Sequence, residues 1–256
     1  MRLLVSVRCA AEVGAALAGG ADIIDAKEPE RGPLGPVSAQ VLAELLSRIP
    51  KHRAASIALG DLTTADEVLA AISPLPLASR PAPLYLKLGF AGVSAPEQIQ
   101  ALIMTAVAAS SKQPVRPHIV PVAYADFMLA GTAAPDTIGR VAARSGATGV
   151  LLDTYTKNGR SLFTWIGEAA LAQWVGCARR AGLASAVAGG LDLKDLEAVC
   201  MAAPDVVGVR GAACEGGRQG RVTSDRVRAL RRRIHETSGS LQGPDQALLE
   251  AGSRNA

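Results

Sequence analysis

Three stretches of the chain bring lysines and aspartates to the end of an apolar run. They are "DIIDAK", with Asp25 and Lys27, "LYLKLG", with Lys87, and "VLLDTYTK", with Asp153 and Lys157. A lysine near other cations or in a dry site has a lowered pKa, and its neutral amine can attack a carbonyl carbon to form a Schiff base. A second amine or a carboxylate can then move the proton on the neighbouring carbon. The pattern predicts carbonyl chemistry of the aldol or dehydration type, with no metal and no cofactor.

Strand periodicity decides whether these charges meet. Successive side chains of a β-strand point to opposite faces, so Asp25 and Lys27 share one face of their run. Lys87 and Asp153 fall on the corresponding faces of two other runs, and Lys157 joins them if the extended conformation continues beyond residue 155. Taken alone, each lysine is equally well a surface residue or part of an interior salt bridge. Burying several charges costs several kcal/mol per ion unless they are paired, which favours a shared site.

The elements that position these residues alternate regularly. Apolar runs expected to be strands cover residues 3–7, 22–27, 54–59, 84–90, 118–124, 149–155, 184–189 and 206–211, with helical patterns between them, including a long one over residues 163–182. Such alternation predicts a parallel sheet covered by helices, and eight units are typical of a (β/α)₈ TIM barrel, whose sites lie at the carboxyl ends of the strands. A doubly wound sheet is the alternative, but "SVRCAAEVG" lacks the G-x-G-x-x-G of its first turn.

A single α/β domain over residues 1–236 is expected to be the catalytic barrel. Residues 237–256 are polar and small, and we expect a disordered tail there.

Glycines follow the last two expected strands. "VAGG" places Gly189 and Gly190 directly before a helical pattern, and "VRGAAC" places Arg210, Gly211 and Ala212 after the eighth strand. Glycine lets backbone N–H groups approach an anion, and these two loops are the frequent phosphate site of TIM barrels. We therefore expect phosphate binding by these five residues.

Composition excludes several other classes of function. The net charge of +4 comes largely from an arginine-rich helix near the C-terminus, which is read as a solvated face. Aromatic residues make up 3%, which argues against nucleic-acid binding. The four cysteines and three histidines are scattered, which indicates neither a disulfide framework nor a metal site. Because no disulfide framework is indicated, a reducing cytosol fits, and we expect a cytoplasmic protein. No run is apolar enough to span a membrane.

Longer phrases give a more specific indication. In order, "LLVSV", "GGADIIDAKEPERGPLG", "YLKLG", "AYAD", "LLDTYTKNG", "LFTW", "AVAGG" and "VVGVRGAACEGG" cover nearly the whole chain except the tail. They resemble the (5-formylfuran-3-yl)methyl phosphate synthase family, also called 4-(hydroxymethyl)-2-furancarboxaldehyde-phosphate synthase. The resemblance implies that Lys27 forms the Schiff base and Lys87 accepts a proton. It also implies that Asp25, Asp153 and Lys157 are further active-site residues.

The same resemblance implies a lyase that condenses two molecules of glyceraldehyde 3-phosphate, a phosphorylated triose, into a furan aldehyde phosphate for methanofuran or its bacterial analogue. The Ala/Arg-rich composition and the C-terminal extension depart from the archaeal pattern. We expect a homo-oligomer, as is common for such barrels. Two alternatives stay open, another Schiff-base aldolase acting on phosphorylated sugars and a non-catalytic phosphate-binding barrel.

Overall fold

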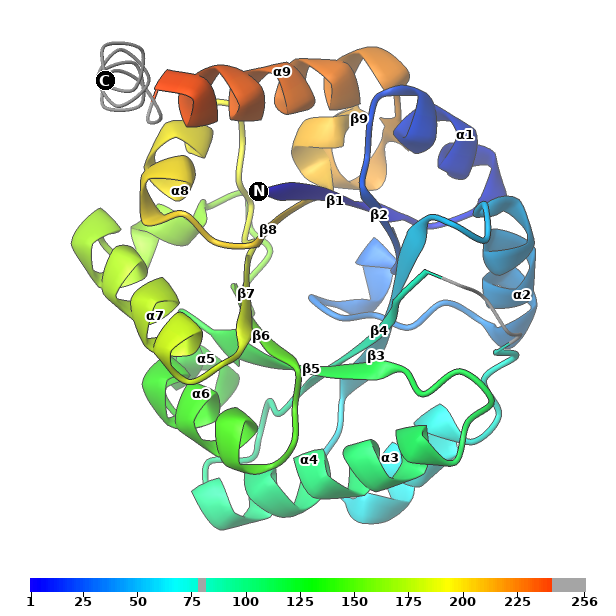
Figure 1. Ribbon diagram of the computed structural model, residues 1–256, viewed down its shortest axis with the longest axis vertical. Coiled ribbons are helices and arrows are strands. Elements are labelled where there is room, and N and C mark those ends of the chain that lie inside the picture. Colours follow the sequence, from blue (N-terminus) through cyan, green and yellow to red (C-terminus); the bar gives the residue numbers. More distant parts are fainter. Residues whose placement is uncertain (78–81, 241–256) are drawn as a thin grey trace, which may run out of the picture.

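Eight parallel strands close into a barrel at the centre of the molecule (Figure 1). The computed structural model describes residues 1–77 and 82–240. The barrel strands are β1 (Arg2–Val7), β2 (Ile23–Ala26), β3 (Ala54–Asp61), β4 (Leu84–Gly89), β5 (His118–Tyr124), β6 (Gly149–Asp153), β7 (Ala184–Val187) and β8 (Val206–Val209). Each strand pairs with the next in the sequence, and β8 pairs with β1 to complete the ring. The predicted TIM barrel is confirmed.

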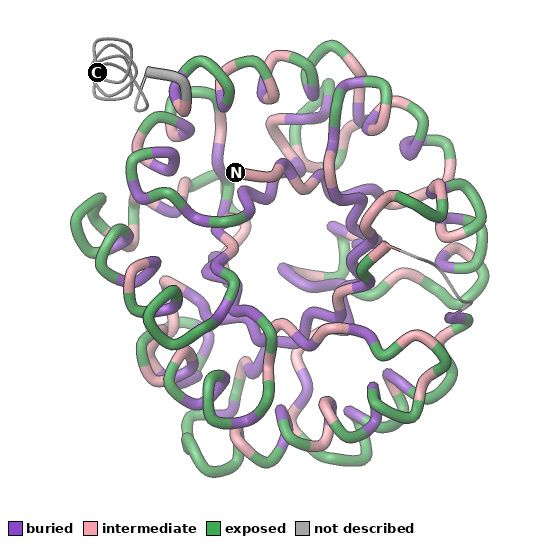
Figure 2. Tube along the Cα trace, in the orientation of Figure 1, coloured by how far each residue is buried: buried purple, intermediate pink, exposed green. Residues whose placement is uncertain are grey.

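Helices surround this ring (Figure 1). They are α1 (Ala10–Ala18), α2 (Ala39–Arg48), α3 (Ala65–Ile72), α4 (Pro96–Ser111), α5 (Phe127–Ala130), α6 (Pro135–Arg144), α7 (Glu168–Arg180), α8 (Leu196–Ala202) and α9 (Ser224–Ser240). The main core lies between strands and helices, where the outward-facing Leu3, Val5 and Val7 of β1 are fully buried. In Figure 2 the strands are mostly buried and the outer helix faces are exposed. Because the helices cover the outer side of the barrel, they leave the carboxyl ends of the strands uncovered, and a site can form there.

Several strands end earlier than the apolar runs suggest. The last residue pair between β5 and β6 is Tyr124 with Asp153, so β6 stops two residues short of the expected end. Beyond it, the backbone N–H groups of Tyr155 and Thr156 donate to the Asp126 carboxylate at 2.6 and 2.8 Å. Because a side chain replaces the neighbouring strand as acceptor, the chain leaves the sheet and turns.

The long helix expected over residues 163–182 is shorter in the structure. A 3₁₀ turn, η2 (Leu162–Thr164), comes first, and α7 begins only at Glu168, after Gly167. The N–H of Leu162 donates to the carbonyl of Gly189 at 2.7 Å, which ties this segment to the loop after β7. The expectation was wrong because a contact between distant segments overrides the local helical pattern.

The chain after β8 forms ordered structure that the glycine-rich sequence did not predict. It comprises η3 (Gly211–Ala213), the antiparallel pair β9 (Cys214–Glu215) and β10 (Arg221–Val222), and η4 (Gly217–Gln219) between them. Helix α9 then closes the outer ring against α1 and α8 and runs to Ser240. It therefore extends past residue 236, where we placed the end of the domain, and residues 241–256 of the expected tail lie outside the described residues.

Candidate active site

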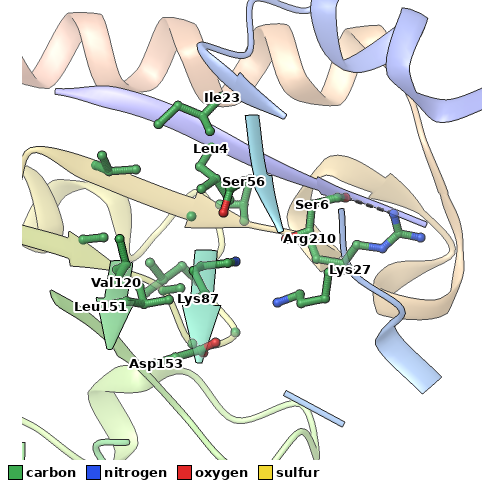
Figure 3. Close-up of a pocket in the computed structure, with 18 of the residues that line it drawn as sticks. Leu4, Ser6, Ile23, Lys27, Ser56, Lys87, Val120, Leu151, Asp153 and Arg210 are labelled. Atoms are coloured by element: carbon green, nitrogen blue, oxygen red, sulfur yellow. Dashed lines mark hydrogen bonds between the residues drawn. The ribbon is translucent and has the colours of Figure 1, made fainter. Parts of the chain in front are cut away.

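A cavity of about 400 Å³ opens among the loops at the carboxyl ends of the strands and continues into the barrel. Its wall includes Lys27, Lys87, Asp153 and Lys157, which come from β2, β4 and β6 or the residues just after them. Figure 3 shows the Lys27 and Lys87 side chains in one open space, with Asp153 facing it from another strand. The structure thus brings together the charges that strand periodicity placed on one face.

Two of the three lysines are held by aspartates. The Nζ atom of Lys87 lies 2.7 Å from Oδ1 of Asp25, whose Oδ2 accepts a hydrogen bond from the Ser6 hydroxyl at 2.7 Å. The Nζ atom of Lys157 lies 2.6 Å from Oδ1 of Asp153. Asp25 is fully buried, and Asp153 is 1% exposed. Each pair places a cation and a carboxylate where water cannot screen them.

Lys27 lies between these pairs without a carboxylate of its own. Over residues 1–77 and 82–240, its amine has neither an ion pair within 4 Å nor a hydrogen bond. Burial lowers its pKa, and the charges of Lys87 and Lys157 add to that effect; Asp153 and Asp25 oppose it only in part, leaving a value of about 7. Lys27 therefore has a large neutral fraction near neutral pH.

The two aspartates remain ionised for the opposite reason. Burial works against the charge of Asp25, but Lys87 and Lys27 outweigh it and hold its pKa below the ordinary value. Burial also opposes the ionisation of Asp153, and Lys157 and Lys27 bring its pKa down to about 2. Both carboxylates therefore carry charge at neutral pH, and both can orient an amine or accept a proton transiently.

Lys157 reaches the cavity by a turn rather than along an extended strand. The continuation of β6 that would have aimed both Tyr155 and Lys157 inward does not occur. Tyr155 is 36% exposed and packs edge-on against Tyr124, with ring centroids 5.5 Å apart. The Asp126 carboxylate holds the turn and so sets the position of Lys157, a role that sequence reasoning missed although "AYAD" was part of the resemblance.

The glycines after β7 line the cavity and are held in conformations that other residues rarely adopt. Gly189 has a φ of +114°, and a Cβ there would lie 2.9 Å from Cγ2 of Thr154. Gly190 has a φ of +63°, and a Cβ there would lie 2.5 Å from the carbonyl oxygen of Arg160. Glycine is required at both positions by backbone shape and by close approach. Gly211 and Ala212, which follow the neighbouring strand β8, line the same cavity.

The guanidinium of Arg210, which we expected at a phosphate, is instead used within the protein. It makes a buried ion pair with Glu12 of α1, with Nη1 2.5 Å and Nη2 3.1 Å from the carboxylate oxygens. Its remaining donors bond the backbone carbonyls of Ser6, Arg218 and Gly220. Arg210 therefore holds the loop after β8 against α1 and lines the cavity without a donor to spare.

Arg218 is the arginine that faces the cavity from that loop, and sequence reasoning missed it. Its Nη2 donates to the carbonyls of Pro29 and Gly32, in the loop after Lys27, at 3.2 and 2.8 Å. In the described part of the chain no carboxylate lies within ion-pair distance of it, and burial lowers its pKa. Arg218 lies outside the strands, so the alternation of side chains along a strand could not predict where it points. Its closeness in the sequence to Gly211, an expected phosphate-binding residue, was the one signal that could have found it.

Two further findings concern sites of other kinds. Within the described ranges, no three His, Cys, Asp or Glu side chains are grouped so that they could hold a metal ion. No described helix is both long and apolar enough to cross a membrane.

Fold and site together define an enzyme class, a TIM barrel with buried amines and carboxylates at the carboxyl ends of its strands. The sequence model of the 4-HFC-P synthase family matches residues 3–231, and the chain belongs to that family. It is 35% identical over 235 residues to (5-formylfuran-3-yl)methyl phosphate synthase of Methanothermobacter thermautotrophicus, covering 90% of this chain and 98% of that protein. The synthase of the same name from Archaeoglobus fulgidus is 31% identical over 236 residues, with coverage of 92% and 100%.

Solved structures share the fold at lower sequence identity. 3-Hexulose-6-phosphate synthase from Salmonella typhimurium aligns with a TM-score of 0.60 at 17% identity, over 93% of this chain and 100% of that one. KGPDC from Streptococcus mutans aligns with a TM-score of 0.61 at 16% identity, over 92% of this chain and 98% of that one. At such identities the likeness concerns the barrel alone.

Proposed function

We propose that this protein condenses two molecules of glyceraldehyde 3-phosphate into (5-formylfuran-3-yl)methyl phosphate, with release of one phosphate and two water molecules. The product would serve the biosynthesis of methanofuran or its bacterial analogue. The observation that carries the proposal is an unpaired, buried Lys27 with a pKa of about 7 among ion-paired charges, in a chain whose relatives bear the name of that synthase.

Lys27 is the proposed nucleophile because it differs electrostatically from the other two lysines. The amines of Lys87 and Lys157 each lie within 2.7 Å of a carboxylate that holds them, whereas the Lys27 amine has no such partner among the described residues. The Lys27 amine attacks the aldehyde carbon of the first triose phosphate, and loss of water gives an imine. As a protonated iminium, this group acidifies the hydrogen on the adjacent carbon.

Lys87 is the proposed acceptor of that hydrogen, after its own proton has moved to Asp25. The ion pair, with Ser6 on the other carboxylate oxygen, supplies a short path for such a transfer. The electron pair left on carbon then expels the phosphate of the first triose. The resulting carbon nucleophile adds to the central carbon of the second triose, after proton transfer has converted that triose into its ketone isomer. The terminal hydroxyl of the second triose closes the ring on the carbonyl carbon beside the imine, loss of two water molecules completes the furan, and hydrolysis of the imine frees Lys27.

Phosphate binding is assigned to the rim of the cavity. Backbone groups of Gly189, Gly190, Gly211 and Ala212 lie around one opening, and Arg218 adds a charge that no described carboxylate neutralises. An anion gains most where N–H groups and a desolvated cation converge. Arg218 thus takes the place that we first assigned to the Arg210 side chain.

The test is turnover with a defined substrate. Purified protein is incubated with glyceraldehyde 3-phosphate, the ultraviolet absorbance of a conjugated furan aldehyde is followed, and the product is identified by mass spectrometry. A simple six-carbon aldol product would support the aldolase alternative, and binding without turnover would support the non-catalytic one. Either result would overturn the proposal.

Lys27→Ala tests the nucleophile. Borohydride added during turnover should leave a mass adduct on Lys27 in the native protein and none in the variant, which should lose turnover by several orders of magnitude. Lys112→Ala, at the exposed end of α4, is the matched control and should behave as the native protein. Full activity in Lys27→Ala would exclude the assignment.

A further inference from the structure

The cavity does not stop at the lysines but continues toward the amino-terminal end of the barrel. On and just after β6, β7 and β8, its lining has no side chain larger than a methyl group at five positions, Gly149, Ala184, Ala186, Ala188 and Gly208, while Leu151 and Val206 supply larger apolar side chains. Leu4 of β1, Ile23 of β2 and Val120 of β5 supply further apolar side chains, and Figure 3 labels all three. The small residues leave a hollow that the larger ones do not fill.

The exposure of the side chains that point into the barrel confirms that this hollow is open space. TIM-barrel interiors are normally filled by layers of branched side chains. Here Leu4, Val120 and Ala186 point into the barrel and are still only partly buried, whereas their outward-facing neighbours Leu3 and Val187 are fully buried. The interior of this barrel is therefore less well packed than the layer outside it.

An unfilled, carbon-lined hollow lowers the stability of the folded state, because its lining loses contacts that a packed core would make. The lining favours an apolar occupant over water. The polar side chains of Arg2, Tyr85, Thr148 and Ser185 also line the cavity, but they are hydrogen-bonded within the protein. The hydroxyl of Ser56 on β3 differs from them, because it is 1% exposed and has no hydrogen-bond partner among the described residues. A buried hydroxyl without a partner costs free energy until a ligand supplies one.

We propose that this hollow is a compartment for the flat, unsaturated ring formed late in the reaction. The Ser56 hydroxyl donates a hydrogen bond to the ring oxygen, and the phosphate stays at the rim. The inference rests on the proposed function, and it extends that function by assigning a binding site to the dehydrated state. Triose phosphates carry hydroxyl groups that an apolar wall would desolvate without compensation, so the hollow stabilises the ring more than the substrates.

The test is equilibrium binding of phosphate esters that lack an aldehyde and cannot form an imine. Calorimetry with the native protein should show furan-2-ylmethyl phosphate binding about tenfold or more tightly than glycerol 3-phosphate, because the ring buries apolar surface. Ala186→Leu, which fills the hollow, should remove that preference and leave the affinity for glycerol 3-phosphate unchanged. Ala143→Leu, on the exposed face of α6, is the matched control and should retain the preference.

Ser56→Ala tests the hydrogen bond without changing the shape of the hollow. It should weaken furan-2-ylmethyl phosphate about fivefold and leave benzyl phosphate, which has no ring oxygen, unaffected. Equal binding of the furan and glycerol esters to the native protein would overturn the compartment, as would a furan preference that survives in a folded Ala186→Leu. If the Leu variant does not fold, Gly208→Ala replaces it, since the added Cβ would lie 3.3 Å from that of Ala188. These outcomes do not depend on turnover, so the compartment and the proposed reaction can fail separately.

Discussion

The three lysines of the cavity are chemically identical residues that the protein makes different through their neighbours. Lys87 and Lys157 each have an aspartate within ion-pair distance, whereas Lys27 is surrounded by charges that it does not touch. Burial lowers the pKa of Lys27 to about 7, so its amine can act as the nucleophile, whereas a carboxylate holds each of the other two amines in place.

The pKa of Lys27 predicts how imine formation depends on pH. Only the neutral amine attacks a carbonyl, so the rate of borohydride trapping should rise with pH through a midpoint near 7. In Lys157→Met the midpoint should move to higher pH, because a nearby cation is lost and Asp153 is left to favour charged Lys27. Lys112→Met should not shift it. A midpoint that stays fixed or falls in Lys157→Met would contradict this account.

The same shift links Lys27 to stability. Its ordinary pKa of 10.5 returns when the chain unfolds, so between about pH 7 and 10.5 the unfolded state holds a proton that the folded state does not. The contribution of this residue to the free energy of unfolding therefore rises with pH across that range. Below pH 7 the buried amine is charged, and it lowers the free energy of unfolding. The reactive group thus reduces the stability of the folded protein.

Strand periodicity was sufficient to place Asp25, Lys27, Lys87 and Asp153 on the interior side of their strands. It did not apply to Arg218 or Asp126, which lie outside strands, where side-chain direction depends on contacts between distant segments. Arg210 was placed correctly after β8, but its side chain was assigned to a ligand because nothing local indicates a partner 198 residues away.

At the scale of elements, one ion pair fixes the loop that forms a wall of the cavity. Glu12 is a buried carboxylate on α1 that accepts from Arg210 and from the backbone N–H of Arg8. Arg210 in turn donates to the carbonyls of Arg218, within η4, and of Gly220, which follows it. The loop after β8 is thus shaped by a residue from the first helix.

Glu12→Gln should therefore destabilise the protein by about 3–5 kcal/mol, because it leaves the Arg210 charge buried without its counter-ion. Urea unfolding followed by circular dichroism measures the change. Asp225→Asn removes the partner of Arg228 in an exposed pair and should have a far smaller effect. Equal losses of unfolding free energy in the two variants would show that the buried ion pair stabilises the protein no more than the exposed one.

Element order and type followed from the sequence, while element ends did not. All eight barrel strands lie within or close to the expected runs, because near-continuous apolar stretches have few other stable arrangements. The start of α7 and the end of β6 depend on Gly189 and Asp126, residues far from either in the sequence. The short helix α5 was missed because four residues are too few for a helical period to show.

At the scale of the whole molecule, α9 completes the ring of helices. Val227, Leu230 and Ile234 are buried on its inner face, and Arg231 pairs with Asp22 beside β2. The helix thus covers the seam where β8 meets β1 (Figure 1). Within the described residues, the side chains that hold it to the barrel include those at positions 227, 230, 231 and 234.

A chain ending at residue 240 should therefore keep the turnover and the unfolding midpoint of the full protein. A chain ending at Val222, which lacks α9, should fail to fold cooperatively, since the apolar surface of α1 and α8 loses its cover. Thermal unfolding and a turnover assay on each of the two shortened chains measure these outcomes. Loss of activity in the longer chain would place part of the catalytic unit beyond residue 240. The expected homo-oligomer stays a prediction, for which sedimentation velocity is the measurement.

The pairing of Glu12 with Arg210 also has a consequence for how the protein is made. The two residues are 198 positions apart, and β1 must wait for β8 before the barrel can close. While the ribosome is still adding residues, the first strands have no closing partner, and contacts of such long range form slowly. In refolding, Lys27 should therefore become trappable at the rate at which the native far-ultraviolet signal returns, and not before. A half-made chain would then expose no reactive amine to the aldehydes of metabolism.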